Sequence, residues 1–314
     1  MSDAKSKDSE VIILLALYNG AKNIEAQLQS IARQTHKEWS LIVSDDGSVD
    51  QGPEIVRQFC KAHPDKKITL MEGPKSGFVA NFLALLSVAN PNAPFIALSD
   101  QDDIWLEGKI ERAITMLRKL PEDTPALYCS RTCIWNEHLE ASSLSTLFPK
   151  PPSFQNALVQ NIASGNTMVF NNTTLEMLQA ASPTSADTAC HDWWIYQMVS
   201  GAGGAVIYDT AAFIKYRQHS ENLIGANNTT RASLSRVGMM MKGYFKSWNT
   251  RNIATLQAND KWLTPESRAV LAQFVVARNT WLLPRIIGIY KSGINRQTLK
   301  GNIGLILAVL MGKI

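Results

Sequence analysis

The first hundred or so residues alternate short apolar runs with segments of helical periodicity, and this order limits the folds open to the chain. The run VIILLALYN, residues 11–19, is continuous, rich in β-branched side chains and closed by Asn19-Gly20, which is typical of a strand buried on both faces. Similar runs predict strands at 39–48, 66–73 and 94–100, and helical spacing predicts helices at 21–34, 52–60 and 77–89. This order predicts a mainly parallel sheet with helices on both faces.

Polar side chains cluster where three of these strands should end. The clusters are YNG at 18–20, DDGS at 45–48 and DQDD at 100–103. Ligands of open α/β sheets gather at the carboxyl ends of the strands, so we expect a binding site there. Neither a GxGxxG nor a GxxxxGK[ST] motif occurs in these turns, which excludes a dinucleotide fingerprint and a P-loop.

The third cluster contains three carboxylates within four residues, Asp100, Asp102 and Asp103. Packed at one strand end, they could share Mg²⁺ or Mn²⁺, which takes oxygen ligands and often binds substrate phosphates as well. The alternative is structural. Asp102 and Asp103 could cap a helix that begins near Ile104, where carboxylates favour the N-terminal dipole.

Composition indicates a globular protein with ordinary thiols. With 314 residues, 45% of them hydrophobic, the chain can form one large or two smaller domains. Its four cysteines form no CxxC pair, which argues against a zinc site or a disulfide framework. The polar N-terminal segment MSDAKSKDSE has no apolar core of a signal peptide, so we expect a cytoplasmic protein.

Six sequence blocks carry a resemblance to a known family. In chain order they are LALYNG, QTHKEWSLIVSDDGS, ALSDQDDIW, SGNTMVFN, HDWW and YRQHSENLIG, which span roughly residues 10–225. This series resembles bacterial family 2 glycosyltransferases, and within them the rhamnosyltransferase-like enzymes of surface-polysaccharide assembly. The resemblance implies an α/β fold of the GT-A type, Rossmann-like, with a nucleotide-sugar-binding and catalytic domain at 1–225 and a mainly helical basic extension at 226–314.

The resemblance also implies a reaction. The enzyme would move a sugar, with inversion and with Mg²⁺ or Mn²⁺, from a nucleotide donor to a saccharide or lipid-linked saccharide. The expected donor is dTDP-L-rhamnose, or otherwise a UDP-hexose, and the products would be O-antigen, capsule or another surface polysaccharide. Asp192 in HDWW matches the catalytic base that takes the acceptor proton.

Further roles follow residue by residue from the same resemblance. On the donor side, Asp46 would accept the pyrimidine N3–H, Tyr18 would lie against the base beside Asn19, and Lys75 would contact phosphate. Asp100 would lie near the ribose or a metal-bound water, Asp102 would bind the metal directly, and His219 would complete the metal shell. Contacts with the acceptor or the donor sugar are implied for Asp103, Gly165, Trp193, Trp194 and Arg217.

Each of these residues also has a structural interpretation. Asp192 could be a helix N-cap, with both tryptophans in the core, and Asp46 could belong to an ordinary turn. His219 could be a solvated loop histidine. The sequence leaves these alternatives open.

Charge is divided unevenly along the chain. From Arg231 onward 13 Lys and Arg stand against Asp260 and Glu266, so this tail carries +11 and the remainder −7. Its longest uninterrupted apolar stretch, IGLILAVLMG, is shorter than the roughly 20 residues of a spanning helix. We expect the tail to dock on the anionic cytoplasmic leaflet, near a lipid-linked acceptor. The alternatives are a helical cap packed on the acidic body and an oligomer contact.

Other function classes fit the sequence less well. Aspartyl phosphotransferases place a DxD run after the first strand, where this chain has LYNG. A nucleotide-sugar-binding protein without activity would not need Asp102 and Asp192. No nucleic-acid recognition motif accompanies the basic tail, so we expect no nucleic-acid partner.

Overall fold

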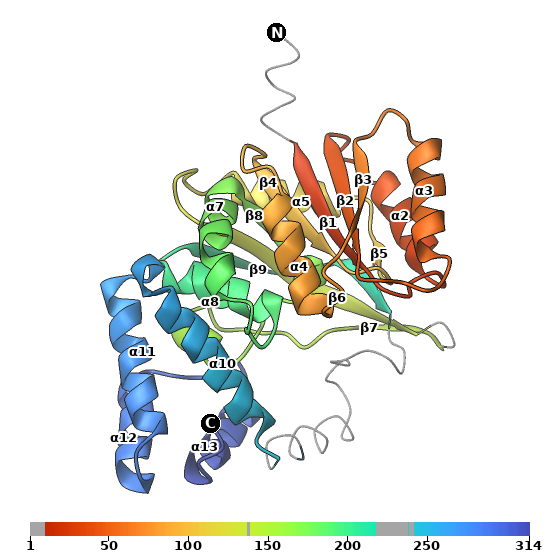
Figure 1. Ribbon diagram of the computed structural model, residues 1–314. Coiled ribbons are helices and arrows are strands. Elements are labelled where there is room, and N and C mark those ends of the chain that lie inside the picture. Colours follow the sequence, from red (N-terminus) through yellow and green to blue (C-terminus); the bar gives the residue numbers. More distant parts are fainter. Residues whose placement is uncertain (1–9, 137–138, 218–237, 239–241) are drawn as a thin grey trace.

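The computed structural model describes residues 10–136, 139–217, 238 and 242–314. Within them a single mixed sheet runs through the centre of the molecule (Figure 1). Its strands follow the order β3-β2-β1-β4-β8-β6-β9-β5, and β7 pairs with β6. Helices cover both faces of this sheet.

The first half of the sheet is parallel, as the sequence predicts. Its strands are β1 (Val11–Leu17), β2 (Trp39–Asp45), β3 (Ile68–Glu72) and β4 (Phe95–Ser99), connected through α2 (Ile24–Ala32), α3 (Gly52–Ala62) and α4 (Phe78–Val88). Alternate residues of β1 enter two different cores. Leu14 packs on the face covered by α4, whereas Ile13 and Leu15 pack on the face covered by α2 and α3. Burial on both faces explains why β1 reads as a continuous apolar run.

The second half of the sheet is mixed. Its strands are β5 (Ile104–Trp105), β6 (Ala126–Asn136), β7 (Leu139–Leu144), β8 (Val169–Asn171) and β9 (Ala205–Arg217), and its helices are α5 (Lys109–Leu117), α6 (Phe154–Ala157), α7 (Asn172–Ala181) and α8 (His191–Gly201). Short 3₁₀ turns lie at η1 (Gly165–Thr167), η2 (Ser182–Thr184) and η3 (Asp260–Trp262). Strand β8 runs antiparallel to both β4 and β6.

The helix-cap interpretation of the acidic cluster is wrong. Ile104 and Trp105 form strand β5, which pairs antiparallel with Lys215 and Ile214 of β9. The next helix, α5, begins only at Lys109, with Gly108 as its N-cap residue. Asp102 and Asp103 therefore precede a strand rather than a helix.

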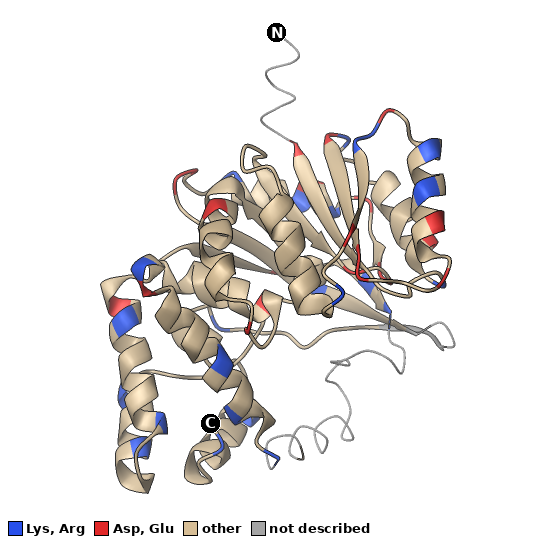
Figure 2. Cartoon of the chain, viewed as in Figure 1, with Lys and Arg blue, Asp and Glu red and all other residues tan. Residues whose placement is uncertain are grey.

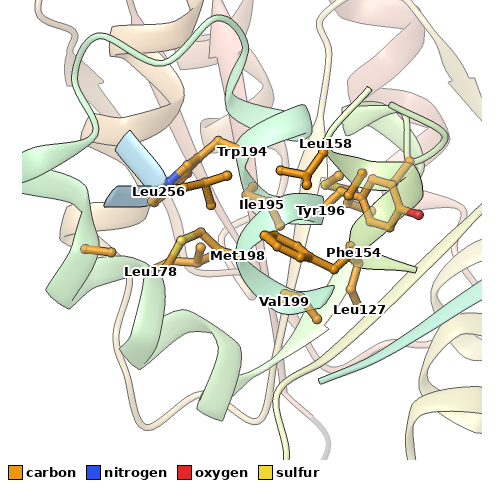
Figure 3. Packing of buried hydrophobic residues seen from close by; sticks show 14 of the residues in the cluster. Leu127, Phe154, Leu158, Leu178, Trp194, Ile195, Tyr196, Met198, Val199 and Leu256 are labelled. Atoms are coloured by element: carbon orange, nitrogen blue, oxygen red, sulfur yellow. The ribbon is translucent and has the colours of Figure 1, made fainter. Parts of the chain in front are cut away.

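The C-terminal region is helical, as expected. It contains α10 (Tyr244–Ala258), α11 (Pro265–Arg278), α12 (Leu282–Lys291) and α13 (Leu299–Leu310). Leu256 of α10 packs beside Trp194 and Leu178 (Figure 3), so this region shares a core with the sheet-bearing part. The boundary expected between 225 and 226 lies outside the described residues, and the division into two domains stays a prediction. Among the described helices, none has the length and apolar character needed to cross a bilayer.

Candidate active site

The turns after β1 and β4 are joined by one side chain. The amide of Gln101 accepts the main-chain N–H of Tyr18 at 2.8 Å and donates to the Tyr18 carbonyl at 3.0 Å. The Tyr18 ring itself is exposed, so its flat face is open to a ligand. Sequence reasoning gave Gln101 no role, although its position between Asp100 and Asp102 was a signal that it belongs to the site.

Asn19 connects the same turn to the turn after β2. Its main-chain N–H donates to Ser48 Oγ at 2.8 Å, and its Oδ1 accepts the N–H of Val49 at 2.9 Å. The residue adopts φ +48°, a left-handed conformation that asparagine tolerates better than most residues. Asn19 therefore holds two strand-end turns together at the edge where a donor is expected.

Asp46 is buried beneath the loop that leads into α4. Its carboxylate accepts the N–H of Gly77 at 2.7 Å and that of Ser76 at 3.3 Å. Each carboxylate oxygen can still accept another hydrogen bond. Lys75, in the same loop, is exposed and adopts φ +57°. The donor contacts predicted for Asp46 and Lys75 stay predictions.

Asp103 is the buried residue of the turn at 100–103, which we call the acidic turn. Its side chain is only 1% exposed and accepts Asn166 Nδ2 at 2.6 Å and the N–H of Arg217 at 3.4 Å. Burial, with the neighbouring Asp102 carboxylate, raises the pKa of Asp103 to about 7, while its hydrogen bonds oppose the shift. The sugar contact expected of Asp103 is corrected, because so buried a carboxylate positions the turn instead. Asn166, in the SGNTMVFN block, was also missed as a positioning residue.

One carboxylate from a distant part of the sequence, Asp192, lies near the three carboxylates of the turn at 100–103. Burial raises the pKa of Asp100 well above its ordinary value, and the carboxylates of Asp103, Asp102 and Asp192 raise it further. Asp192 comes from α8, about 90 residues beyond the acidic turn. That these residues share a site stays a prediction; in its favour, the Gly165 N–H donates to Asp192 while the neighbouring Asn166 donates to Asp103.

A buried lysine partly balances this negative charge. Lys109, the first residue of α5, is fully buried, and its Nζ lies 3.5 Å from the centroid of the Trp105 ring. Within the described residues Nζ has no hydrogen-bond partner. Burial lowers the pKa of Lys109 to about 7, opposed by the attraction of Asp103 and Asp100. Sequence reasoning missed Lys109, because lysine is usually a surface residue.

Asp192 is held at the start of α8. Its carboxylate accepts the main-chain N–H of Gly165 at 3.1 Å and that of Trp193 at 2.6 Å. The N-cap residue is Cys190, so Asp192 is not the N-cap of this helix. A Cβ atom at Gly165 would lie 2.9 Å from His191 Nε2 and 3.3 Å from Asp192 Cβ. Only glycine lets η1 approach α8 this closely.

The two tryptophans after Asp192 belong to the core. Trp193 is buried and donates from Nε1 to the Ala157 carbonyl at 2.6 Å. Trp194 is fully buried beside Leu256 and Leu178 (Figure 3). Neither indole presents a face to a sugar, so the expected stacking contact is corrected in favour of the structural interpretation.

Arg217 also acts on the acidic turn rather than on a sugar. Its Nε donates to the Asp102 carbonyl at 3.1 Å, and its guanidinium lies 4.9 Å from the centroid of the Trp135 ring. The side chain is buried, which corrects the expected acceptor contact. His219 lies outside the described residues. Within the described part of the chain, no cluster of three or more His, Cys, Asp or Glu side chains is arranged to hold a metal ion.

His191 makes the stability of this region depend on pH. It stacks on Phe82 with ring centroids 3.9 Å apart, and burial lowers its pKa from 6.5 to about 4. Between these values the unfolded chain binds a proton that the folded chain excludes, so we expect the free energy of unfolding to fall by about 3 kcal/mol as pH drops from 6.5 to 4.

Urea denaturation of the wild type and of His191→Leu across this window measures that contribution. Asp103 has the opposite effect, because its raised pKa lets the folded state bind the extra proton, but it acts equally in both proteins. The difference between the two curves should therefore be due to His191. Parallel curves would contradict this expectation.

Comparison of the sequence with family models and with known proteins finds relatives of the chain. The family model Glycosyl transferase family 2 matches residues 12–168, half of the chain. The chain is 27% identical over 282 residues to the dTDP-rhamnosyl transferase RfbG of Shigella flexneri, covering 86% of this chain and 94% of that protein. It is 35% identical over 114 residues to the glucosyltransferase WfgD of Escherichia coli, covering 36% of this chain and 42% of that one.

Solved structures with the same fold include a mannosyltransferase and a UDP complex. The mannosyltransferase PcManGT from Pyrobaculum calidifontis, in complex with GDP-Man and Mn²⁺, aligns with a TM-score of 0.53 at 17% identity over 96% of this chain and 85% of that one. TarS 1–349 of S. aureus, in complex with UDP, aligns with a TM-score of 0.54 at 14% identity over 90% and 89%. The likeness extends from the parallel strands into the C-terminal helices. The fold is thus of the GT-A type, and with its family-model match the protein belongs to glycosyl transferase family 2.

Proposed function

We propose that the protein transfers L-rhamnose from dTDP-L-rhamnose, or otherwise a hexose from a UDP-sugar, to a saccharide or lipid-linked saccharide of a surface polysaccharide. The observation that carries this proposal is that two neighbouring residues of η1 link Asp192 to the acidic turn, since the Gly165 N–H donates to Asp192 and the Asn166 amide donates to Asp103. A base and a diphosphate-binding turn are the two parts that sugar transfer from a nucleotide requires. The donor is suggested by the name of the relative RfbG.

Asp192 is the proposed base. Two main-chain N–H groups orient its carboxylate, and its remaining lone pairs can accept the proton of an acceptor hydroxyl. The acceptor oxygen then bonds to the anomeric carbon as the bond from that carbon to the diphosphate oxygen breaks. A single displacement of this kind inverts the anomeric centre, and it needs no nucleophile from the protein.

The acidic turn offers suitable ligands for Mg²⁺ or Mn²⁺. Asp100 and Asp102 supply oxygen ligands. Burial, and after it the repulsion of the neighbouring carboxylates, raises the pKa of Asp100, and a cation held by Asp100 and Asp102 would relieve that repulsion. Asp102 and Asp100 would hold the ion, whose chemistry is the neutralisation of charge on the departing diphosphate. The complex of PcManGT with Mn²⁺ supports this choice.

The donor's nucleotide would lie on the turns after β1 and β2. The exposed ring of Tyr18 offers a stacking face for the base, and Asp46 keeps acceptor capacity for an imide N–H. Gln101 and Asn19 fix these turns relative to the acidic turn. The site is therefore preorganised by hydrogen bonds that require no ligand.

A lipid-linked acceptor would bring the enzyme to the cytoplasmic face of the inner membrane as a peripheral protein. The name of WfgD describes a substrate linked to diphosphoundecaprenol, which supports an acceptor of this class. An oligosaccharide or sugar joined to a lipid diphosphate is presented at the membrane surface, so the transferring enzyme must work close to it.

A donor panel tests the proposal. The protein is mixed with Mg²⁺ or Mn²⁺ and dTDP-, UDP- or GDP-sugars, and both melting temperature and nucleotide release are measured. At a hundredfold excess over Kd, ligand binding adds about 2.7 kcal/mol, which raises Tm by about 5 °C. We expect dTDP-L-rhamnose to give this shift, EDTA to abolish it, and acceptor to trigger dTDP release.

Two other results would contradict the proposal. Binding of a nucleotide sugar without turnover, with every acceptor offered, would favour a non-catalytic binding protein. Stabilisation that survives EDTA would remove the metal role of Asp102.

A further inference from the structure

Two C-terminal helices turn apolar faces toward solvent. The exposed residues recur every three to four positions, so they form one face of each helix. On α12 they are Leu282, Leu283, Ile286, Ile287 and Tyr290, and on α13 they are Leu299, Ile303, Ile306, Leu307 and Leu310. Trp281, just before α12, is also exposed. We call this set the apolar C-terminal face.

The opposite sides of these helices dock on the rest of the protein. Ile289 of α12, with Leu305 and Val309 of α13, belongs to the core cluster that also contains Trp194. A surface helix normally turns its polar side outward once its apolar side is buried. Here both sides are apolar. Exposed apolar surface on neighbouring helices marks an interaction site rather than an ordinary protein surface.

The two helices are tied to each other. Arg285 of α12 donates to the Val309 carbonyl of α13 at 3.1 Å and to the Thr280 carbonyl at 2.7 Å. Arg278 of α11 donates to the Ile314 carbonyl at 3.0 Å. In Figure 1 α12 and α13 accordingly lie near each other at the lower end of the molecule. Hydrogen bonds therefore fix the position of the two helices that bear the apolar side chains.

The charge of the C-terminal helices indicates what kind of surface would cover the apolar C-terminal face. Residues 267–314 contain seven Lys and Arg and no Asp or Glu. Figure 2 accordingly shows basic but no acidic residues on α12 and α13. Lys291 ends α12 and Lys300 lies in the first turn of α13, and both are exposed beside the apolar residues. Two copies of such a face would repel each other, whereas an anionic surface would attract both the charge and the apolar side chains.

We propose that the apolar C-terminal face lies in the headgroup region of an anionic lipid bilayer. The helices have 10 and 12 residues, shorter than the roughly 20 of a spanning helix, so they lie in the plane of the surface. Trp281 and Tyr290, the latter 86% exposed, suit the interface because one end of each ring is apolar and the other polar. The purpose of this docking, access to a lipid-linked acceptor, depends on the proposed function.

Vesicle co-sedimentation of the full chain tests the proposal without any donor or acceptor. The vesicles contain either phosphatidylcholine alone or equal parts of phosphatidylcholine and phosphatidylglycerol. We expect binding to the mixed vesicles, loss of binding at high salt, and at least about tenfold weaker binding for Ile287→Glu and for Ile306→Glu. These side chains are 53% and 58% exposed, so glutamate can replace them without entering the core.

Val88→Glu is the matched control. Val88 ends α4 outside the C-terminal helices, is 50% exposed, and changes the net charge equally. We expect this variant to bind like the wild type. No binding of the wild type to mixed vesicles, or equal losses for all three variants, would overturn the proposal. So would a dimer in light scattering that Ile287→Glu disrupts, because a second copy would then cover the face. Donor-induced thermal shifts in the same variants separate these results from failure of the proposed function.

Discussion

Asp192→Asn is expected to lower the rate of sugar transfer by about 10²- to 10⁴-fold while leaving the fold and donor binding intact. Asparagine keeps the shape of the side chain and one of the two oxygens that accept the N–H groups of Gly165 and Trp193, so one of these hydrogen bonds can persist. It cannot take a proton from the acceptor hydroxyl. The measurement is kcat for nucleotide release with saturating donor and acceptor, together with the melting shift caused by the donor alone.

A control variant separates loss of the base from loss of charge. Asp65→Asn removes one negative charge from an exposed surface position next to Lys66, and we expect wild-type kcat. If Asp192→Asn kept its kcat within a few-fold of the wild type, the base would have to be another residue. If it lost the donor-induced melting shift as well, Asp192 would be part of donor binding.

Asp102→Asn is expected to have the second largest effect, a fall in kcat/KM of about 10²-fold or more. The change removes a charged oxygen ligand from the acidic turn, so the diphosphate loses the cation that would bind it. We also expect the metal-dependent part of the donor-induced melting shift to disappear. Electron paramagnetic resonance of added Mn²⁺ gives a readout independent of activity, since it counts bound ions directly.

The neighbouring Asp103→Asn variant is the comparison for this prediction. Asp103 is buried against Asn166 and the Arg217 N–H, so its change should lower stability by about 1–3 kcal/mol. Mn²⁺ binding by the folded protein should persist. If Asp103→Asn lost Mn²⁺ binding and Asp102→Asn kept it, the metal ligand would be Asp103, and Asp102 would only position the turn.

The sequence predicted the parallel half of the sheet because buried strands need unbroken apolar runs. Residues 11–17 satisfy that demand on both faces, with Ile13 in one core and Leu14 in the other. The positions of Tyr18, Asp46 and Asp100 at strand ends follow from the same pattern, since the carboxyl ends of parallel strands share one edge. Here local periodicity is sufficient, because the strands and their crossover helices follow one another along the chain.

Contacts between distant segments decided the features that local periodicity does not predict. Ile104 and Trp105 form a strand only because β9, more than 100 residues later, offers an edge to pair with. The same long-range packing buries Asp103 and Lys109 and makes Trp194 a core residue. It also links Asp192 to the acidic turn through η1, whose residues donate to Asp192 and to Asp103. On α13 the sequence shows apolar residues on all sides. The tertiary structure alone decides that Leu305 faces the core and Ile306 faces solvent, because burial depends on which neighbours cover each face.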